Sequence, residues 1–572
     1  MSMELVGVVL IFLITVLLSY PLGRYLAKVF KGEKTILDFM NPVEKWIFRI
    51  CGIDPRKSMN WKEFLKAMLT INLLWFVYGF FLLIFQDKLP LNPDGNPGQT
   101  PDLAFNSIVS FVTNTNLQDY SGESGATYLT QLFVFTFLQF TSAATGIACL
   151  IALFNGLKEK TTNNLGNFWS IFVKSITRVL LPLSVIVAVI LVFSGSPSSF
   201  DGKETIITMQ GDTVQVSRGP AAGMIAIKQL GTNGGGYFGA NSAHPLENPN
   251  YFTNMVELIS IVLISMASIF ALGFYINKKK FAYVIFGVMT FFFVLFCANN
   301  IYFETKGNPE LDKLGISQQA GNMEGKEVRF GAASTAYWSV ITTSTSNGSV
   351  NGMHDSLMPL SGGVVMLDMM INALYGGVGV GLLNYFIYII IAVFIAGLMV
   401  GRTPEFMGHK VEAREVKIAA LVTLLCAFLI KGGTALASYI FVHHPNADWA
   451  VKPSAWLNNP GNHGFSEMLY QYTSSTANNG SGFEGLADNN IFWNVSAGIV
   501  MLLARFLPII GPVAIAGLLA NKKYIPESSG TLKTDSVTFG VMTIAVIVIV
   551  TALSYFPPLA LGPIAEYLGI HH

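Results

Sequence analysis

Ten long apolar runs divide the 572-residue chain and limit what it can fold into. An α-helix needs about 20 apolar residues to cross the ~30 Å hydrocarbon core of a bilayer, and each run approaches or exceeds that length. The runs lie at about 4–23, 67–86, 127–154, 179–194, 254–276, 282–303, 364–401, 416–442, 491–519 and 537–561. They predict an all-α polytopic membrane protein with ten transmembrane helices.

The charge content agrees with a membrane protein. Only 12% of the residues are charged, against about 25% in an average soluble domain. The 35 Lys and Arg and the 34 Asp and Glu leave a net charge of +1. A nucleic-acid-binding protein needs a clear basic excess. We therefore expect contact with the lipid bilayer and none with nucleic acid.

The charges are unevenly distributed around the runs. Five stretches, 24–66, 156–178, 277–281, 402–417 and 521–535, hold 24 of the 35 basic and 11 of the 34 acidic residues. They carry +13, and the rest of the chain carries −12. Lys and Arg accumulate in cytoplasmic loops. Because these stretches alternate with the runs, the sequence predicts a multi-pass protein whose N- and C-termini both lie outside.

The seventh run, 364–401, is too long for one straight membrane helix. It contains Asp368 and the sequence GGVGVG at 376–381. Irregular backbone is tolerated at membrane depth where it is buried in protein or lines a cavity. We therefore expect a broken or hinged helix.

Four outer loops repeat one pattern. Each contains a half-length run, too short to cross a bilayer, and then a polar cluster: TNTNLQ at 113–118, GTNGGG at 231–236, TSTSNGS at 343–349 and SSTANNGS at 474–481. Centred on Thr115, Asn233, Thr345 and Ala477, the clusters recur every 112 to 132 residues. Such a period indicates internal duplication. The half-length runs are about 103–112, 221–230, 332–342 and 464–473.

This pattern predicts four pseudo-symmetric helix–pore loop–helix repeats around one selectivity filter. Units are expected at 1–58 (anchor helix and basic segment), 59–160, 161–280, 281–410 (with the broken helix), 411–525 and 526–572 (last helix).

Glycine-rich loops at membrane depth favour an ion filter made of backbone carbonyls. A ring of carbonyl oxygens can replace the hydration shell of a potassium ion. Glycine suits such loops because it adopts backbone angles that other residues reach poorly. Gly234, Gly348 and Gly480 each follow an Asn, whereas the first cluster offers Asn114 or Asn116 instead.

The sequence at these loops resembles the potassium-binding A subunit of Kdp-type potassium-transporting ATPases, within the superfamily of potassium transporters. The similar segments are SFVTNTNLQDYSGE at 110–123, QLGTNGGGYFGANSAHPLENP at 229–249, TTSTSNGSVNGMHDS at 342–356, GLMVGRTPEFMGHKVE at 397–412 and YTSSTANNGSGFEGL at 472–486. The resemblance extends from the first run to the last.

The resemblance implies K⁺ as the bound and transported ion, held at one site by carbonyls of the loops. By position it assigns this site to Asn114, Thr115, Asn116, Thr232, Asn233, Gly234, Ser346, Asn347, Gly348, Asn478, Asn479 and Gly480. Gln118 would lie at the filter entrance. Asn347 stands where the family often has Cys, which leaves a backbone carbonyl ligand possible.

The resemblance also implies partners. We find no GxxxxGK[ST] loop and no aspartyl-phosphate segment of the P-type kind, so we expect no ATP site and no catalytic residue in this chain. ATP would be hydrolysed by a P-type ATPase subunit, accompanied by small accessory membrane subunits in a bacterial cytoplasmic (inner) membrane. The alternative is a gradient-driven, channel-like K⁺ translocator of the Trk/Ktr/HKT type, gated by soluble subunits.

Two charges inside the predicted helices, Asp368 and Arg505, are costly in a membrane, at ~2.5–3.5 kcal/mol each on insertion scales. Together with Gly377 and Gly379 they are candidates for an ion route or hinge; alternatively, the two charges only fix packing, as an interior pair or near the interface. His244, His354 and His463 lie in outer loops without ligand spacing. We expect them to be solvated.

Overall fold

The computed structural model describes residues 3–158, 161–401, 403–526 and 533–571, and it is almost entirely helical. Ten helices are long and apolar enough to cross a membrane, as the sequence predicted. They are α1 (Met3–Lys31), α3 (Trp61–Ile84), α6 (Phe137–Lys158, preceded by a π turn Thr130–Thr136), α7–α8 (Phe168–Ser175 and Leu181–Phe193, joined by a π turn Ile176–Leu180), α10 (Tyr251–Tyr275), α11 (Lys279–Lys306), α15 (Val380–Val400), α16 (Ala413–His443), α18 (Ile491–Ala520) and α19 (Val537–Leu559).

Several of these helices begin at a polar residue that caps their free backbone N–H groups. Asn60 accepts hydrogen bonds from Lys62 N and Glu63 N. Asn250 and Asn490 do the same at the starts of α10 and α18. Asparagine is a favoured N-cap because its side-chain oxygen satisfies donors that have no partner within the helix. These caps therefore fix where the apolar helices start.

The seventh apolar run forms two helices instead of one. They are α14 (Pro359–Ile371) and α15, and residues 372–379 between them are not helical. Asn372, with φ +48°, ends α14, and Gly376 and Gly379 also have positive φ. A left-handed residue ends a helix, because the next residues leave its axis.

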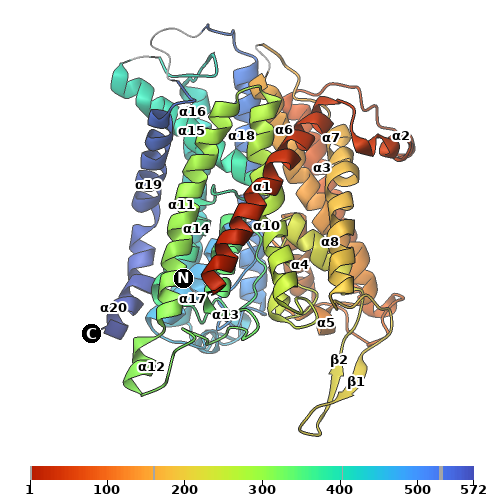
Figure 1. The fold of residues 1–572 in the computed structure, drawn as a ribbon, viewed down its shortest axis with the longest axis vertical. Coiled ribbons are helices and arrows are strands. Elements are labelled where there is room, and N and C mark those ends of the chain that lie inside the picture. The colour runs from red at the N-terminus through yellow and green to blue at the C-terminus, as the bar shows by residue number, and fades with distance from the viewer. Residues whose placement is uncertain (1–2, 159–160, 402, 527–532, 572) are drawn as a thin grey trace.

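Four further helices lie between pairs of spans. They are α4 (Pro101–Val112), α9 (Ala221–Leu230), α13 (Gly331–Ser344) and α17 (Asn462–Ala477). Each matches one of the half-length runs and leads into one of the polar clusters. Figure 1 labels α4, α13 and α17 in the lower half of the molecule.

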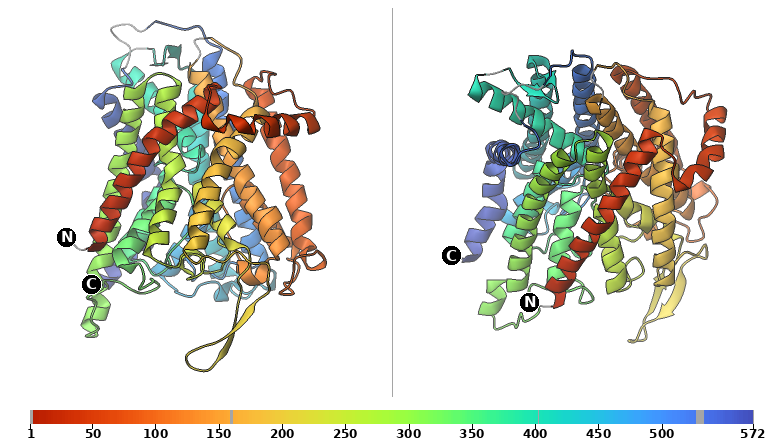
Figure 2. Two further views of the ribbon diagram at one scale, coloured as in Figure 1. Left: turned by 45° about the vertical axis from the view of Figure 1, so that its right-hand side comes forward. Right: turned by 45° about the horizontal axis from the view of Figure 1, so that its top comes forward.

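The two ends of the helix bundle differ. One end carries the strands β1 (Glu204–Ile207) and β2 (Thr213–Val216), an antiparallel hairpin that projects beyond the helices in both views of Figure 2. Both labelled chain ends lie toward this end, which we call the hairpin face (Figure 1). The described parts of the five basic stretches lie at the opposite end, which we call the basic face.

Shorter elements complete the two faces. They are η1 (Ile36–Met40), α2 (Asn41–Ile50), η2 (Gln86–Lys88), α5 (Gly122–Gly125), η5 (Asn241–Ala243), α12 (Pro309–Lys313), β3 (Glu405–Phe406), β4 (His409–Lys410), η6 (Asp448–Ala450), η7 (Pro453–Ala455), the π turn Ala560–Ile564 and α20 (Ala565–His571).

The helices differ in how much apolar surface they keep exposed. In α6 and α10, 89% and 78% of the apolar window is buried inside the protein, against 22% in α1, which lies along α10 on the outside. Exposed apolar side chains on α1, such as Leu13 and Leu17, suit contact with lipid. The buried helices α6 and α10 surround the polar loops at the centre.

Candidate functional site: a ring of four loops

The four polar clusters adopt one backbone conformation. Two residues in each have positive φ, separated by one residue. The first positions are Asn114, Thr232, Ser346 and Asn478, with φ between +49° and +60°, and the second are Asn116, Gly234, Gly348 and Gly480, with φ between +54° and +98°. The central residues are Thr115, Asn233, Asn347 and Asn479. We call these twelve residues the four-loop ring.

One hydrogen bond recurs in every repeat. The backbone N–H of the central residue donates to the carbonyl five residues earlier, in the last turns of the preceding short helix. These bonds are Thr115 N to Ser110 O (2.9 Å), Asn233 N to Lys228 O (2.8 Å), Asn347 N to Thr342 O (2.9 Å) and Asn479 N to Ser474 O (2.9 Å). Each loop is therefore held in the same way at the C-terminus of its helix.

This alignment corrects two of the expected cluster centres. The third and fourth centres are Asn347 and Asn479, not Thr345 and Ala477, because α13 and α17 extend further than the sequence predicted. Thr345 is the C-cap of α13, and Ala477 is the last residue of α17. It also assigns Asn116, not Asn114, to the glycine position of the first loop.

The glycines bring neighbouring loops together. A Cβ on Gly234 would lie 1.8 Å from the carbonyl oxygen of Asn347. A Cβ on Gly348 would lie 2.1 Å from Asn479 O, and one on Gly480 would lie 2.0 Å from Thr115 O. In these three contacts, one loop's glycine thus meets the next loop's central carbonyl, which leaves no room for a side chain.

The remaining contact, between the first and second loops, is made by different residue types. Asn116 carries a Cβ at the glycine position, and the facing residue is Gly235, where an added Cβ would lie 2.8 Å from Asn116 Cβ. The Asn114 amide also donates to Thr232 O at 2.8 Å. The four loops therefore form a closed ring, and all twelve predicted filter residues belong to it.

Most carbonyls of the ring have no hydrogen-bond donor. Among the described residues, only Thr232 O and Gly234 O accept a bond, from the Asn114 and Asn241 amides. Eleven of the twelve residues are buried, and Gly480 is partly buried. More than 90% of buried backbone carbonyls in proteins are paired. A set of buried, unpaired carbonyls in one ring is what a bound cation would satisfy.

Side chains of the central asparagines are bonded elsewhere. Asn347 Nδ2 donates to Lys228 O at 3.1 Å, and Asn479 Nδ2 donates to Thr342 O at 2.8 Å. Each amide thereby attaches its loop to the short helix of the preceding repeat. An asparagine can make these contacts where a smaller side chain could not.

Gln118 lies beside the second loop. Its Oε1 accepts from Gly236 N at 2.8 Å, and its Nε2 donates to Gly236 O at 3.2 Å. Gln118, predicted to lie at the filter entrance, therefore joins the first and second loops through one amide.

A buried ion pair behind the second loop was not predicted. The Lys228 ammonium pairs with Glu247, with both side chains 0% exposed. It also donates to Asn241 Oδ1 at 2.7 Å, and Asn241 in turn bonds Gly234 O. A lysine inside the apolar run 221–230 was the available signal, since an unpaired buried charge is costly.

The non-helical segment 372–379 lies against the ring. Val378 N donates to Thr232 Oγ1 at 2.9 Å, and Ser346 Oγ donates to Asn372 Oδ1 at 2.9 Å. A Cβ on Gly377 would meet Ser346 and Thr232 at 3.7 and 3.8 Å, an ordinary contact. A Cβ on Gly379 would lie 2.2 Å from Gly146 O, so this glycine is required where the segment touches α6.

The two membrane charges do not form a pair. Asp368 Oδ2 accepts from Thr343 Oγ1 at 2.9 Å and from Ser344 Oγ at 2.6 Å, at the end of α13. The Arg505 side chain is buried and makes no ion pair or hydrogen bond within the described part of the chain. It lies one helical turn after Met501, whose carbonyl accepts from Asn478 Nδ2 at 3.2 Å.

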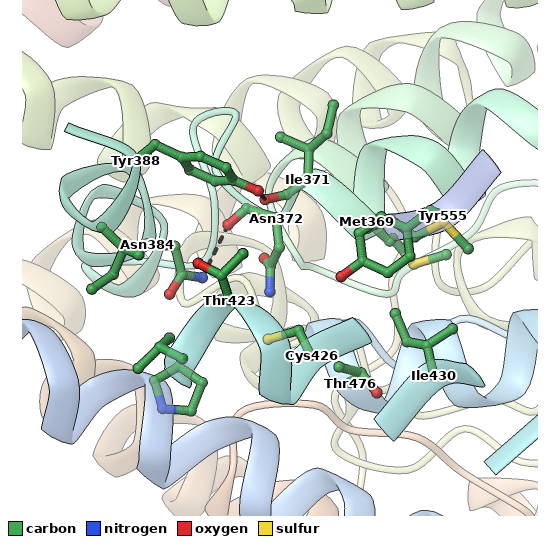
Figure 3. Close-up of a pocket in the computed structure, with 14 residues that line it drawn as sticks. Met369, Ile371, Asn372, Asn384, Tyr388, Thr423, Cys426, Ile430, Thr476 and Tyr555 are labelled. Carbon is green, nitrogen blue, oxygen red and sulfur yellow. Dashed lines mark hydrogen bonds between the residues drawn. The ribbon is translucent and has the colours of Figure 1, made fainter. Parts of the chain in front are cut away.

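A cavity of about 40 Å³ opens beside the break, which is room for a few water molecules at about 10–15 Å³ each. Figure 3 shows side chains from α14, α15, α16 and α19 around it. Asn384 Nδ2 donates to Asn372 O at 3.0 Å, and Thr476 of α17 contributes a hydroxyl without a partner among the described residues. The break and the end of α17 thus share one small, mainly apolar cavity that carries a few polar groups.

Contrary to expectation, His354 is buried, and His244 and His463 are only partly exposed. His354 is 1% exposed and bonds Tyr470 Oη at 2.8 Å; burial, with the nearby Lys326 charge, lowers its pKa to about 3. His244 stacks on Phe238 with ring centres 3.9 Å apart. His463 bonds two carboxylates. Tertiary packing covers these three rings wholly or in part, and the spacing of the histidines along the chain does not reveal this burial.

Comparison with known proteins gives full-length matches. The family model for the potassium-transporting ATPase A subunit matches residues 9–568. A protein of Flavobacterium psychrophilum named potassium-transporting ATPase potassium-binding subunit is 63% identical over 573 residues, covering 100% of both chains. Proteins of the same name from Bacteroides thetaiotaomicron and Alicyclobacillus acidocaldarius are 61% and 48% identical, covering 100% and 99% of this chain and 100% of each relative.

One solved structure shares the fold at low identity. The crystal structure of the potassium transporter TrkH from Vibrio parahaemolyticus matches with a TM-score of 0.50 and 15% identity. The match covers 89% of this chain and 98% of that one. The ten spans and four re-entrant loops therefore belong to an architecture that a second protein has.

Proposed function

The chain belongs to the family of potassium-transporting ATPase A subunits, and from this premise we propose how it holds and passes its ion. It is the potassium-binding subunit of a potassium-transporting ATPase, a multi-pass membrane protein with K⁺ as the transported ion. The proposal concerns which atoms bind K⁺, from which side it arrives and where it goes next.

We assign K⁺ binding to the four-loop ring, through backbone carbonyls of the central residues Thr115, Asn233, Asn347 and Asn479 and their neighbours. One observation carries this assignment: ten buried or partly buried carbonyls of the ring have no donor among the described residues. A dehydrated K⁺ needs such oxygens. No Asp or Glu belongs to the ring, and the C-termini of α4, α9, α13 and α17 add favourable dipoles.

The hairpin face is proposed to be the outer side of a bacterial cytoplasmic membrane. Support comes from the five basic stretches, whose described parts lie at the basic face and whose sequences hold 24 of the 35 Lys and Arg, because such loops stay in the cytoplasm. K⁺ then reaches the ring from outside past Gln118. ATP is hydrolysed by a P-type ATPase subunit of the same complex, with small accessory membrane subunits.

After the ring, the ion is proposed to pass along the broken helix. The segment 372–379 touches the second and third loops, and the cavity beside it reaches Thr476 near the fourth. Gly379 lets the segment approach α6 closely, and Gly377 faces the second and third loops. Asp368 fixes the end of α13. Arg505 is a buried cation on α18, one helical turn after the Met501 carbonyl that binds Asn478 of the fourth loop, and it controls passage toward the basic face.

The gradient-driven alternative receives no comparable support. The likeness to TrkH is 15% in sequence and concerns the fold alone. A channel-like translocator would conduct K⁺ without any ATPase partner.

The test is K⁺-stimulated ATPase activity of the complex purified after co-expression with its partner subunits. Gly234→Asp places a Cβ 1.8 Å from Asn347 O and adds a charge. We expect a lower apparent K⁺ affinity and weaker discrimination against Rb⁺. Unchanged affinity and selectivity would overturn the assignment of the second loop, and K⁺ flux without a co-purifying ATPase would favour the alternative.

A further inference from the structure

A second polar site lies on the hairpin face, near the start of α17 and the C-terminal helix α20 (Figure 1). It consists of Asp355, Asn459, His463, Glu467 and Glu566, and we call it the His463 cluster. Asp355, Asn459, His463 and Glu566 line a cavity of about 450 Å³. The cavity is large enough to admit a hydrated ion. None of these residues belongs to the four-loop ring.

The cluster has the geometry of metal ligands. His463 and Glu467 are four residues apart on α17, so their side chains lie on one face of the helix. Asp355 comes from the loop that follows the third repeat's filter residues. One ligand atom from each of these three residues lies within 4.8 Å of the others, and His463 Nε2 is 2.9 Å from Asp355 Oδ1.

The other nitrogen of His463 is oriented by a carboxylate. Nδ1 lies 2.8 Å from Glu566 Oε1. A metal-binding histidine almost always donates its second N–H to such an acceptor, which fixes the tautomer and the ring orientation. Glu566 therefore has the place of a positioning residue, and Nε2 is the nitrogen that faces Asp355.

One oxygen of the cluster has no partner. Glu467 is 0% exposed, and its Oε2 makes no hydrogen bond with any described residue. Its Oε1 accepts only from the N–H and amide of Asn459, at 3.2 Å each. A buried, unpaired carboxylate oxygen is costly unless a cation or a proton satisfies it.

The charges of the cluster are unbalanced. In the part of the chain that the structure describes, Asp355 and Glu566 form salt bridges only with His463, and Glu467 forms none. Three carboxylates thus face at most one positive charge. A dication bound through Nε2 would displace the proton there and reduce the net charge of the cluster from −2 to −1.

The backbone at Gly485 packs closely against two of the carboxylates. Gly485 faces Glu467 and Asp355, and a Cβ there would lie 2.4 Å from Glu467 Oε1 and 2.8 Å from Asp355 Oδ2. Any side chain at position 485 would clash with the two carboxylates and displace them.

We infer that the His463 cluster binds one divalent cation of the zinc class through Asp355, His463 and Glu467, with Glu566 positioning the imidazole. One nitrogen and two carboxylate oxygens match the ligands that zinc takes in proteins. Calcium and magnesium prefer oxygen ligands alone. The inference does not depend on the function proposed for the four-loop ring.

The site is connected to the fourth filter loop by a row of rings. His463 stacks on Phe483 with ring centres 5.7 Å apart, and Phe483 stacks on Tyr470 at 4.2 Å. Tyr470 Oη lies 2.7 Å from Ser481 Oγ, next to Gly480. A bound ion would hold α17, the third-repeat loop and α20 together and so stiffen the loop that ends in Gly480.

The test uses the complete purified complex, stripped with a chelator and titrated with Zn²⁺. We expect one Zn²⁺ per chain and a higher melting temperature, with no such effect from Ca²⁺ or Mg²⁺ at equal concentration. Co²⁺ should bind in place of Zn²⁺ and give visible absorption bands. His463→Gln and Glu467→Gln should each abolish these bands, and Glu566→Gln should weaken binding by roughly 10–100-fold.

Matched controls separate this site from others. The exposed neighbours His443 and His444 are an alternative surface site, so His443→Gln/His444→Gln should leave stoichiometry unchanged. Gly485→Ala retains every ligand yet should weaken Zn²⁺ binding. Zn²⁺ binding should also persist in Gly234→Asp, whatever that variant does to K⁺. Failure to bind Zn²⁺, or loss of binding only in the His443/His444 variant, would overturn the inference.

Discussion

Single residues decide whether the four loops meet. Gly234, Gly348 and Gly480 combine positive φ with contacts that no Cβ could occupy. In the first loop Asn116 has φ +54°, a value that asparagine tolerates better than most residues, and Gly235 supplies the missing space opposite. The ring therefore closes with three glycines at equivalent positions and one displaced by a residue.

Gly348→Ala should disrupt the ring. The new Cβ would lie 2.1 Å from Asn479 O at φ +89°, and a left-handed conformation alone costs about 1–2 kcal/mol for a residue with a Cβ. We expect apparent K⁺ affinity to fall by roughly tenfold or more. Gly482→Ala is the matched control, since nothing lies within 4 Å of its Cβ position and its φ is not positive. Equal affinities for the two variants would contradict this prediction.

Lys228→Met should destabilise the protein and loosen the second loop. It leaves Glu247 buried without its cation, which costs about 3–5 kcal/mol, and removes a donor to Asn241. Melting temperature in detergent and K⁺ affinity should both fall. Lys313→Met removes an exposed bridge to Glu310, worth about 0–1 kcal/mol. If the two variants melt alike, the buried pair has no structural role.

At the scale of residues, the sequence predicts the ring residues better than the side chains that hold the ring in place. The resemblance to the family assigned the twelve ring residues, and glycine and asparagine in the four clusters indicated unusual backbone there. Asn241 and Asn372 could not be predicted, since their contacts with Gly234 and Ser346 depend on how the loop after Gly234 and the break after α14 fold back on the ring. The expectation that His354 is solvated was wrong because its burial also depends on tertiary packing.

At the scale of elements, four short helices and one broken helix organise the centre. The short helices were predictable because apolar runs of about ten residues cannot cross a bilayer. The break was expected from the length of run 364–401 and its glycines, but its bounds were not. It begins at Asn372, earlier than the glycines at 376–381, because Asn372 itself turns left-handed and Asn384 caps its carbonyl.

Gly379→Ala should impair passage more than binding. Its Cβ would lie 2.2 Å from Gly146 O at φ +85°, so segment 372–379 must move away from α6. We expect K⁺-stimulated turnover to fall severalfold, with a smaller change in K⁺ affinity. Gly287→Ala, on the exposed side of α11 with nothing within 4 Å, controls for a glycine-to-alanine change in a membrane helix. Unaltered turnover in Gly379→Ala would argue against a route along the break.

At the scale of the whole molecule, the distribution of charge along the chain and the four copies of one loop pattern indicate the architecture. A net charge of +1 conceals the separation of +13 in the basic stretches from −12 elsewhere. The number of spans followed from hydropathy, and the ring from four copies of one pattern. The order in which the loops meet, and the contacts of α1 with α10, depend on tertiary packing that local pattern does not encode.

The orientation can be tested with thiol labelling. Cys51 is exposed on the basic face, and Met209, in the β1–β2 hairpin, is exposed on the hairpin face. In intact cells, a membrane-impermeant maleimide should label Met209→Cys and spare Cys51. In inverted membrane vesicles the pattern should reverse. Labelling of Cys51 in intact cells would place the basic face outside and reject the proposed direction of binding.

The most direct test of the four-loop ring is to locate the ion by anomalous diffraction at a wavelength near the potassium edge, using crystals of the complex grown in K⁺. We predict an anomalous peak on the axis of the ring, coordinated by the carbonyl oxygens of Thr115, Asn233, Asn347 and Asn479. The peak should disappear when K⁺ is replaced by Na⁺. A strong potassium peak bound instead by carboxylates, with none at the ring, would contradict the assignment.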